Sequence, residues 1–149
     1  MMNDTTQEKA IQSFQSGLNC AQSVVTAYAD RLNFDPDLAA GLSCGFGGGM
    51  GRLQQTCGAL TGAFMVLGIQ NSRKYTDRAE RKNVTYTQVQ QLNEAFRQHQ
   101  GATDCRALLG CDLRTPEGMK FHQETNQSKT ICEKCIAASI EILDGIVNS

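Results

Sequence analysis

The chain has 149 residues, of which 40% are hydrophobic and 6% aromatic, and its formal net charge is −1. This length is typical of one domain that buries its own core, so we expect a single domain over residues 1–149. A net charge near zero gives no electrostatic reason to bind nucleic acid or an anionic membrane surface. The longest apolar stretch, around residues 59–69, contains two glycines and is too short to span a bilayer. The composition therefore predicts neither a nucleic-acid partner nor a membrane partner.

Apolar residues recur at helical spacing along most of the chain, and the alternation typical of strands is nearly absent. Gly17 ends the first predicted helix, Asn19 is a good N-cap for the second, and Pro36 suits the first position of the third. This pattern predicts an all-α fold, a single-domain bundle of about five to seven helices. The expected helical segments, in chain order, are 5–16, 20–33, 36–43, 57–70, 77–100, 105–109, 115–124 and 128–147.

A glycine-rich segment precedes the helix expected at 57–70. Residues 45–51 read GFGGGMG, with five glycines in seven positions, which would be costly inside a helix. We expect a loop there whose backbone has unusual dihedrals or approaches another group closely. The segment does not match a phosphate-binding loop, because Gly51 is followed by Arg52 and Leu53 instead of Lys and Ser or Thr. Arg52 is either a partner for a thiolate or a substrate anion, or a plain surface arginine.

The helix expected at 57–70 carries Gly58 and Gly62 four residues apart, which places them on one face. Small residues there let another backbone approach closely, which predicts a central, buried helix. The same face could instead receive a second copy of the chain, so a homo-oligomer remains open.

Seven cysteines are the most distinctive feature of the composition. The N-terminal segment MMNDTTQE has neither the basic region nor the apolar core of a signal peptide, so we expect a cytoplasmic protein. In that compartment, clustered cysteines are more often catalytic, redox-sensing or metal-binding than joined in permanent disulfides. An odd number also prevents complete pairing within one chain.

Three of the cysteines stand where helices are expected to begin. Cys20 follows Asn19, Cys57 follows a predicted Thr56 cap, and Cys105 follows a predicted Thr103 cap. The unpaired N–H groups and the dipole of a helix start favour a thiolate, so we expect activated thiols at these positions. A carboxylate beside Cys105, that of Asp104, opposes the effect there. The alternative is that these cysteines are small, inert core residues.

Cys132 and Cys135 form a CxxC pair inside the last predicted helix, where the helix-start effect is absent. Both lie on its apolar stripe, and we expect one to be functional and the other to fill the core. A structural zinc site would need a second short-spaced ligand pair, and neither His99 nor His122 supplies one. His99 shares a predicted inward face with Phe96 and is either a base for a thiol or a core or edge residue without a catalytic role.

Several segments taken together resemble a known family. They are Gly17–Val24 (GLNCAQSV), Gly45–Arg52 (GFGGGMGR), Cys57–Gly62 (CGALTG), Cys105–Gly110 (CRALLG) and a late cysteine. In this order they resemble the redox-active proteins named for the pattern C_GCAxxG_C_C, although in the core motif of this chain Cys57 precedes the glycine. The resemblance covers nearly the whole chain and implies redox activity based on four cysteines, with no established substrate.

Carried over to this chain, the resemblance implies Cys20, Cys57, Cys105 and a late cysteine. Cys132 is favoured over Cys135, because Ile136 then takes the apolar place that follows the family's cysteine. Cys44 and Cys111 are extras.

The leading hypothesis is therefore a redox-active protein with Cys57 as the central thiol. Cys20, Cys105 and Cys132 would lie close enough for reversible thiol–disulfide or electron-transfer chemistry, with no cofactor and with a redox partner that the sequence does not name. The alternative is a metal or iron–sulfur module held by the same four cysteines, since helix starts and a glycine-rich loop supply the N–H donors that a cluster needs. A third possibility is a structural or interaction domain with inert cysteines.

Overall fold

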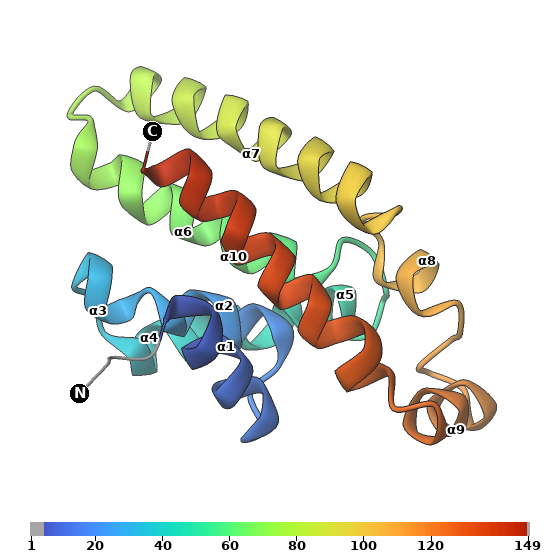
Figure 1. Cartoon of the computed structure of the whole chain (residues 1–149). Coiled ribbons are helices and arrows are strands. Elements are labelled where there is room, and N and C mark those ends of the chain that lie inside the picture. Colours follow the sequence, from blue (N-terminus) through green and yellow to red (C-terminus); the bar gives the residue numbers. More distant parts are fainter. Residues whose placement is uncertain (1–4, 149) are drawn as a thin grey trace.

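The computed structural model describes residues 5–148, and among these residues helix follows helix with no strand (Figure 1). The prediction of an all-α fold is confirmed, and seven of the helices have eight or more residues. Part of the segment used to exclude a signal peptide, residues 1–4, lies outside the described residues. The helices are α1 (Thr6–Gln15), α2 (Cys20–Ala27), α3 (Ala29–Leu32), α4 (Pro36–Ser43), α5 (Gly47–Met50), α6 (Gly58–Lys74), α7 (Arg78–Gln100), α8 (Cys105–Leu109), α9 (Pro116–Glu124) and α10 (Glu133–Val147), with a 3₁₀ turn η1 (Cys44–Phe46) and a π-helical turn η2 (Ser128–Cys132).

Side-chain caps define most of the helix starts. Thr5 and Asn19 each form a capping box with a residue three positions later, and Asp35 and Asp77 accept bonds from the first turns of α4 and α7. The helix expected at 20–33 is instead broken at Tyr28, whose backbone (φ −96°, ψ 0°) separates α2 from α3. The last predicted helix is also divided, because its first turn is the π-helical η2.

Helix α6 lies at the centre of the molecule and packs against α2, α7 and α10 (Figure 1). Nine of its residues are buried, as predicted for this helix. Helix α10 lies between α1 and α7 and closes the core on its other side. The largest fully buried apolar side chains are Tyr28, Phe96, Leu60, Leu67, Leu92, Ile136, Ile140 and Leu143.

Two glycines let α6 approach α2 closely. A Cβ atom at Gly62 would lie 2.8 Å from the carbonyl oxygen of Ala21, and one at Gly58 would lie 3.1 Å from the amide nitrogen of Ala21. The Cβ of Cys20 is only 3.2 Å from that second position. The glycine face predicted for either a helix or a second copy is therefore covered by α2 of the same chain. The close approach also brings the starts of α2 and α6 together.

The glycine-rich segment contains a left-handed turn. Five consecutive residues, 48–52, have φ between 63° and 70°, and the Gly51 amide donates to the Gly47 carbonyl at 2.9 Å. The predicted unusual dihedrals are present, but the segment is a tight helical turn of the opposite hand and not an irregular loop. Non-glycine residues resist this conformation, yet Met50 (φ 70°), Arg52 (φ 64°) and Gln54 (φ 57°) all adopt it.

Two predictions on α7 are wrong. Tyr86, expected on the inward stripe, is 59% exposed, and His99 is exposed as well. Helix α7 lies at the edge of the bundle, so only a narrow stripe represented by Leu92 and Phe96 reaches the core. In residues 5–148, none of the helices has the length and apolar character of a membrane span.

Candidate functional site

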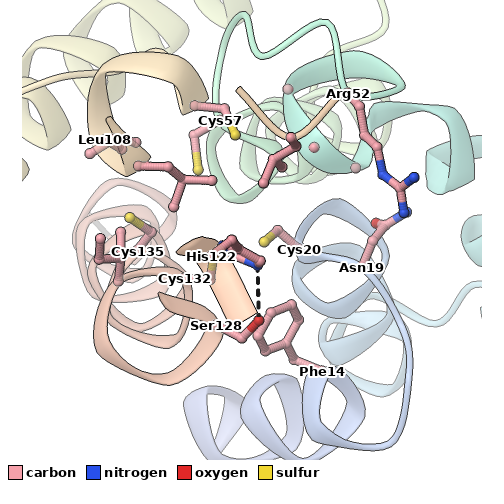
Figure 2. Close-up of a pocket in the computed structure, with 18 of the residues that line it drawn as sticks. Phe14, Asn19, Cys20, Arg52, Cys57, Leu108, His122, Ser128, Cys132 and Cys135 are labelled. Carbon is pink, nitrogen blue, oxygen red and sulfur yellow. Dashed lines mark hydrogen bonds between the residues drawn. The ribbon is translucent and has the colours of Figure 1, made fainter. Parts of the chain in front are cut away.

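A cavity of about 670 Å³ opens where the starts of α2 and α6 face α8, α9 and the start of α10. Figure 2 shows the side chains of Cys20, Cys57 and Cys135 directed toward its interior. The four cysteines of the leading hypothesis all line this cavity, and Cys135 lines it as well. All seven cysteines are free. The two that do not line it are Cys44, which is exposed, and Cys111, which is buried beside it.

Helix starts position two of the thiols. Cys20 is the first residue of α2, as predicted. Cys57 is not the first residue of α6 but its N-cap, so the predicted Thr56 cap is wrong by one residue. Its thiol makes no cap hydrogen bond of standard geometry, but the N–H groups of Ala59 and Leu60 still stabilise its ionised form. Cys57 is 6% exposed.

A short stretch of paired backbone places Cys105 beside Cys57. The Cys57 amide donates to the Thr103 carbonyl at 2.8 Å, and the Cys105 amide donates to the Gln55 carbonyl at 2.7 Å. Thr56 and Asp104 are opposite each other in this antiparallel bridge. Because side chains alternate along paired backbone, those of the two cysteines lie on the same face. The N-cap of α8 is Asp104, not Thr103 as predicted.

The CxxC pair lies where the π-helical turn meets α10. Cys132 ends η2, and Cys135 lies in the first turn of α10. Residues three apart share one helix face, and here both thiols line the cavity. Cys135 is 1% exposed and packs in the hydrophobic core, as expected for one member of the pair, and it lines the cavity as well.

The environment of Cys57 favours its thiolate. Hydrogen bonding from the Cys135 thiol is the largest cause and lowers the pKa of Cys57, while burial acts in the opposite direction. The N–H groups of Ala59 and Leu60 lower the pKa further. This is the effect predicted for a thiol at a helix start, strengthened by a neighbouring thiol that the sequence did not reveal.

The other helix-start thiols have the opposite behaviour, so the prediction of three activated thiols is wrong for two of them. Hydrogen bonding with Cys132, followed by burial, raises the pKa of Cys20 well above its ordinary value. Burial, more than any charged neighbour, raises the pKa of Cys105 to about 12. The pKa of Cys135 is raised chiefly by its hydrogen bond to Cys57 and then by burial. Of these four cavity thiols, Cys57 is the one whose pKa is shifted toward ionisation.

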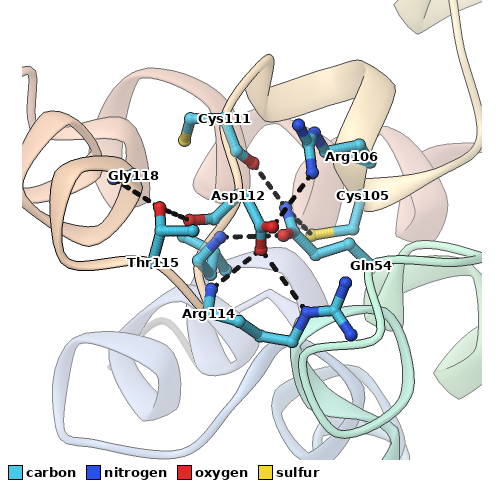
Figure 3. A network of polar contacts seen from close by, with 9 residues as sticks. Gln54, Cys105, Arg106, Cys111, Asp112, Arg114, Thr115 and Gly118 are labelled. Atoms are coloured by element: carbon cyan, nitrogen blue, oxygen red, sulfur yellow. Dashed lines mark hydrogen bonds and ion pairs between the residues drawn. The ribbon is translucent and has the colours of Figure 1, made fainter.

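A polar network fixes the wall formed by the glycine-rich segment (Figure 3). The buried side chain of Gln54 donates to the Cys111 carbonyl at 2.8 Å and accepts from the Leu113 amide at 2.8 Å. The side-chain nitrogen Nε2 of Gln54 also lies 3.9 Å from the Cys105 sulfur. Gln54 therefore joins the left-handed turn to the segment after α8. These hydrogen bonds stabilise the left-handed backbone conformation of Gln54 (φ 57°), which a non-glycine residue would otherwise avoid.

Sequence reasoning considered His122 only as a zinc ligand and missed its place in the cavity, which it lines together with Ser128. Its Nδ1 lies 2.9 Å from Oε1 of the buried Gln127, and its Nε2 lies 3.4 Å from the Ser128 hydroxyl. Because an amide oxygen only accepts, Nδ1 is the donor in the Gln127 contact. The spacing of these three residues matches no metal or triad pattern, so the sequence carried no signal for them.

In residues 5–148, no group of three or more His, Cys, Asp or Glu side chains is arranged to hold a metal ion. A zinc ion or an iron–sulfur cluster on Cys20, Cys57, Cys105 and Cys132 would therefore require the sulfurs to move toward a common centre, since thiolate ligands lie about 2.3 Å from zinc.

Fold and cavity together define a class: a small all-α protein in which cysteine thiols from separate helices share one site. The chain belongs to the family described as putative redox-active protein (C_GCAxxG_C_C), whose model matches residues 18–146. This membership confirms the family resemblance and the general assignment of redox activity. No curated protein and no solved structure matches the chain.

Proposed function

We propose that the protein performs reversible thiol–disulfide chemistry, with Cys57 as the nucleophile and Cys135 as the second thiol of the couple. One observation supports this choice above others: Cys57, at the N-cap of α6, lines the same cavity as Cys135 and packs in the same core cluster, and it is the cavity thiol whose pKa is lowered. The thiolate is the nucleophile in thiol–disulfide exchange, and a neighbouring thiol is needed to resolve the mixed disulfide. The couple therefore differs from the sequence-based set, in which Cys132 was the favoured late cysteine.

In the first step the Cys57 thiolate attacks one sulfur of an oxidised disulfide substrate. A Cys57–substrate disulfide forms, the substrate S–S bond breaks, and a substrate thiolate leaves. The negative charge on Cys57, which holds the pKa of Cys135 above its ordinary value, is then gone. Cys135 consequently loses its proton more readily, and the departing thiolate accepts that proton.

In the second step the Cys135 thiolate attacks the Cys57 sulfur. A Cys57–Cys135 disulfide forms and the remaining substrate thiolate is released. The protein has then lost two electrons and the substrate has gained two. A cellular thiol or a redox partner protein returns the couple to its reduced state.

Cys20 and Cys132 form a second candidate couple, because Cys132 is the largest cause of the raised pKa of Cys20 and both thiols line the same cavity. Cys105 has no such thiol donor, and we propose that it stays protonated. Of the four cysteines predicted from the sequence, Cys57 thus belongs to the first couple and Cys20 and Cys132 form the second. The fourth, Cys105, stays reduced.

To test the couple, the protein is equilibrated in buffers of defined dithiothreitol redox ratio, alkylated and analysed by mass spectrometry. We expect a species that has lost two alkylatable thiols, with a Cys57–Cys135 disulfide in the peptide map. Cys57→Ser and Cys135→Ser should each abolish this species, whereas Cys44→Ser, which alters an exposed cysteine outside the cavity, should retain it. Seven alkylatable thiols at every redox ratio would contradict the proposal.

The alternative proposal is a metal or iron–sulfur centre held by cavity cysteines, and the presence of five thiols in the lining of one cavity supports it. Anaerobic purification followed by metal analysis and a visible spectrum tests it. Stoichiometric iron or zinc that is lost in Cys57→Ser and retained in Cys44→Ser would favour the metal centre over the disulfide couple.

A further inference from the structure

We propose that the oxidised substrate is a small organic disulfide with an apolar body and a carboxylate group. This inference rests on the proposed thiol–disulfide function and deepens it. It follows from three properties of the cavity, namely its depth, the character of its walls and the one charged side chain that lines it.

The depth of the reactive sulfurs favours a small molecule over a protein. Cys57 is 6% exposed and Cys135 is 1% exposed, so a disulfide on the surface of a folded protein cannot approach them closely. A cavity of about 670 Å³ falls within the range of roughly 300–1,000 Å³ that small-molecule sites occupy. A small disulfide could enter it and bring its sulfurs to Cys57.

The walls favour an apolar body. Apart from the thiols and the glycine backbone, most of the wall is hydrocarbon and thioether side chains, which gain from covering apolar surface. The polar lining groups are confined to two places, one at Asn19 and Arg52 and the other at His122, Gln123 and Ser128. The apolar lining residues are Phe14, Leu108, Leu109, Leu113, Met119 and Ile131.

The charge of the lining favours an anion. Arg52 is the one lining residue with a permanent charge, and no aspartate or glutamate lines the cavity among the described residues. Figure 2 shows its guanidinium beside Asn19, which also lines the cavity. Within residues 5–148 this guanidinium has no hydrogen-bond or ion-pair partner, so it is available to a carboxylate. Arg52 ends the left-handed turn (φ 64°) that forms this side of the cavity.

Lipoate is a suitable probe, because it combines a cyclic disulfide, a hydrocarbon chain and a carboxylate. The Cys57 thiolate would open the ring, forming a mixed disulfide and a free lipoyl thiolate that takes the Cys135 proton. Cys135 would then attack Cys57, leaving the protein disulfide and dihydrolipoate. Two electrons pass from the protein to the probe, and no further reactant is required.

The experiment compares the rates at which lipoate and its neutral amide, lipoamide, oxidise the reduced full-length protein. The two probes share the same disulfide and chain, so their rate ratio isolates the carboxylate. In Arg52→Gln we expect this ratio to fall about threefold to fivefold, which is the size of a partly exposed ion pair. Arg78→Gln, at the far start of α7, removes the same charge and should leave the ratio unchanged.

Salt provides a second readout that needs no variant. Raising the ionic strength should slow oxidation of the unaltered protein by lipoate and should leave the lipoamide rate nearly unchanged. A ratio that is unaffected by Arg52→Gln, together with equal salt dependence of both probes, would overturn the inference. If dithiothreitol buffers still produced the Cys57–Cys135 disulfide, only the substrate class would be wrong. If no oxidant produced it, the proposed function would fail as well.

Discussion

The reactivity of Cys57 depends on one neighbouring side chain more than on its helix. Hydrogen bonding from Cys135 is the largest cause of its lowered pKa, ahead of the N–H groups of α6. Cys20 also stands at a helix start, yet its pKa is raised, because its thiol partner Cys132 and burial act against ionisation. The helix start alone therefore does not decide which thiol is activated.

Removing the Cys135 thiol should make Cys57 less reactive. In Cys135→Ala the largest stabilising contact of the thiolate is lost, so the pKa of Cys57 should rise toward its ordinary value of 9.0. We expect its alkylation at pH 7 to slow about tenfold, the lower end of what a hydrogen bond to a charged group contributes. Cys111→Ala, which removes a buried thiol outside the cavity lining, is the matched control. An unchanged Cys57 rate in Cys135→Ala would show that the N–H groups alone activate it.

The sequence was sufficient to predict that four cysteines line one site, but not to predict which of their thiols is activated. Helix starts can be recognised from capping residues, so Cys20, Cys57 and Cys105 could be singled out. Which cysteine thiols become neighbours depends on how the helices pack. At Cys105, burial raises the pKa more than the helix start lowers it. Cys135 was left aside because the family resemblance favoured Cys132, with Ile136 in the apolar place that follows the family's cysteine.

At the level of elements, the site depends on the close contact between α2 and α6. Gly62 permits it, since a Cβ there would lie 2.8 Å from the Ala21 carbonyl oxygen. Gly62→Ala should therefore destabilise the protein by about 1–3 kcal/mol, the usual cost of overpacking a core. Urea unfolding with an unchanged m value measures this loss.

Gly68 offers a control on the same helix. A Cβ added there meets no atom within 4 Å, so Gly68→Ala should be neutral or stabilise the protein by up to about 1 kcal/mol through helix propensity. Equal unfolding midpoints for the two alanine variants would contradict the role assigned to Gly62.

The helices themselves could be predicted better than their interruptions. Caps such as Asn19 and the proline at position 36 define starts in the sequence, and the structure has them. The break at Tyr28 and the π-helical turn before α10 leave no such signature, and the glycines at 45–51 indicated unusual dihedrals but not a left-handed turn. Each depends on tertiary contacts, as the buried side chain of Gln54 shows for the left-handed turn.

At the level of the whole molecule, the protonated cavity thiols link stability to pH. Cys20, Cys105 and Cys135 all have a raised pKa in the folded protein. Above pH 9.0, the ordinary value for these thiols, the unfolded chain loses protons that the folded chain retains. Stability should therefore fall as the pH rises from 9 toward 12, by at most about 1.4 kcal/mol per thiol per pH unit.

Chemical denaturation at pH 8, 9 and 10 measures this slope. Cys105→Ser removes one contributing thiol and should make the slope shallower, whereas Cys44→Ser, at an exposed cysteine, should not. A slope that is the same in both variants would contradict the link between buried thiols and alkaline instability.

The central claim is that Cys57 is the activated thiol of the cavity. Its most direct test is the pH dependence of alkylation at each of the seven cysteines, followed by mass spectrometry of short, substoichiometric reactions with iodoacetamide. The lowered pKa of Cys57 predicts that its rate levels off at a lower pH than the rates of Cys20, Cys105 and Cys135, whose pKa values are raised. A Cys57 rate that levels off at the same pH as theirs, or at a higher pH, would contradict the claim.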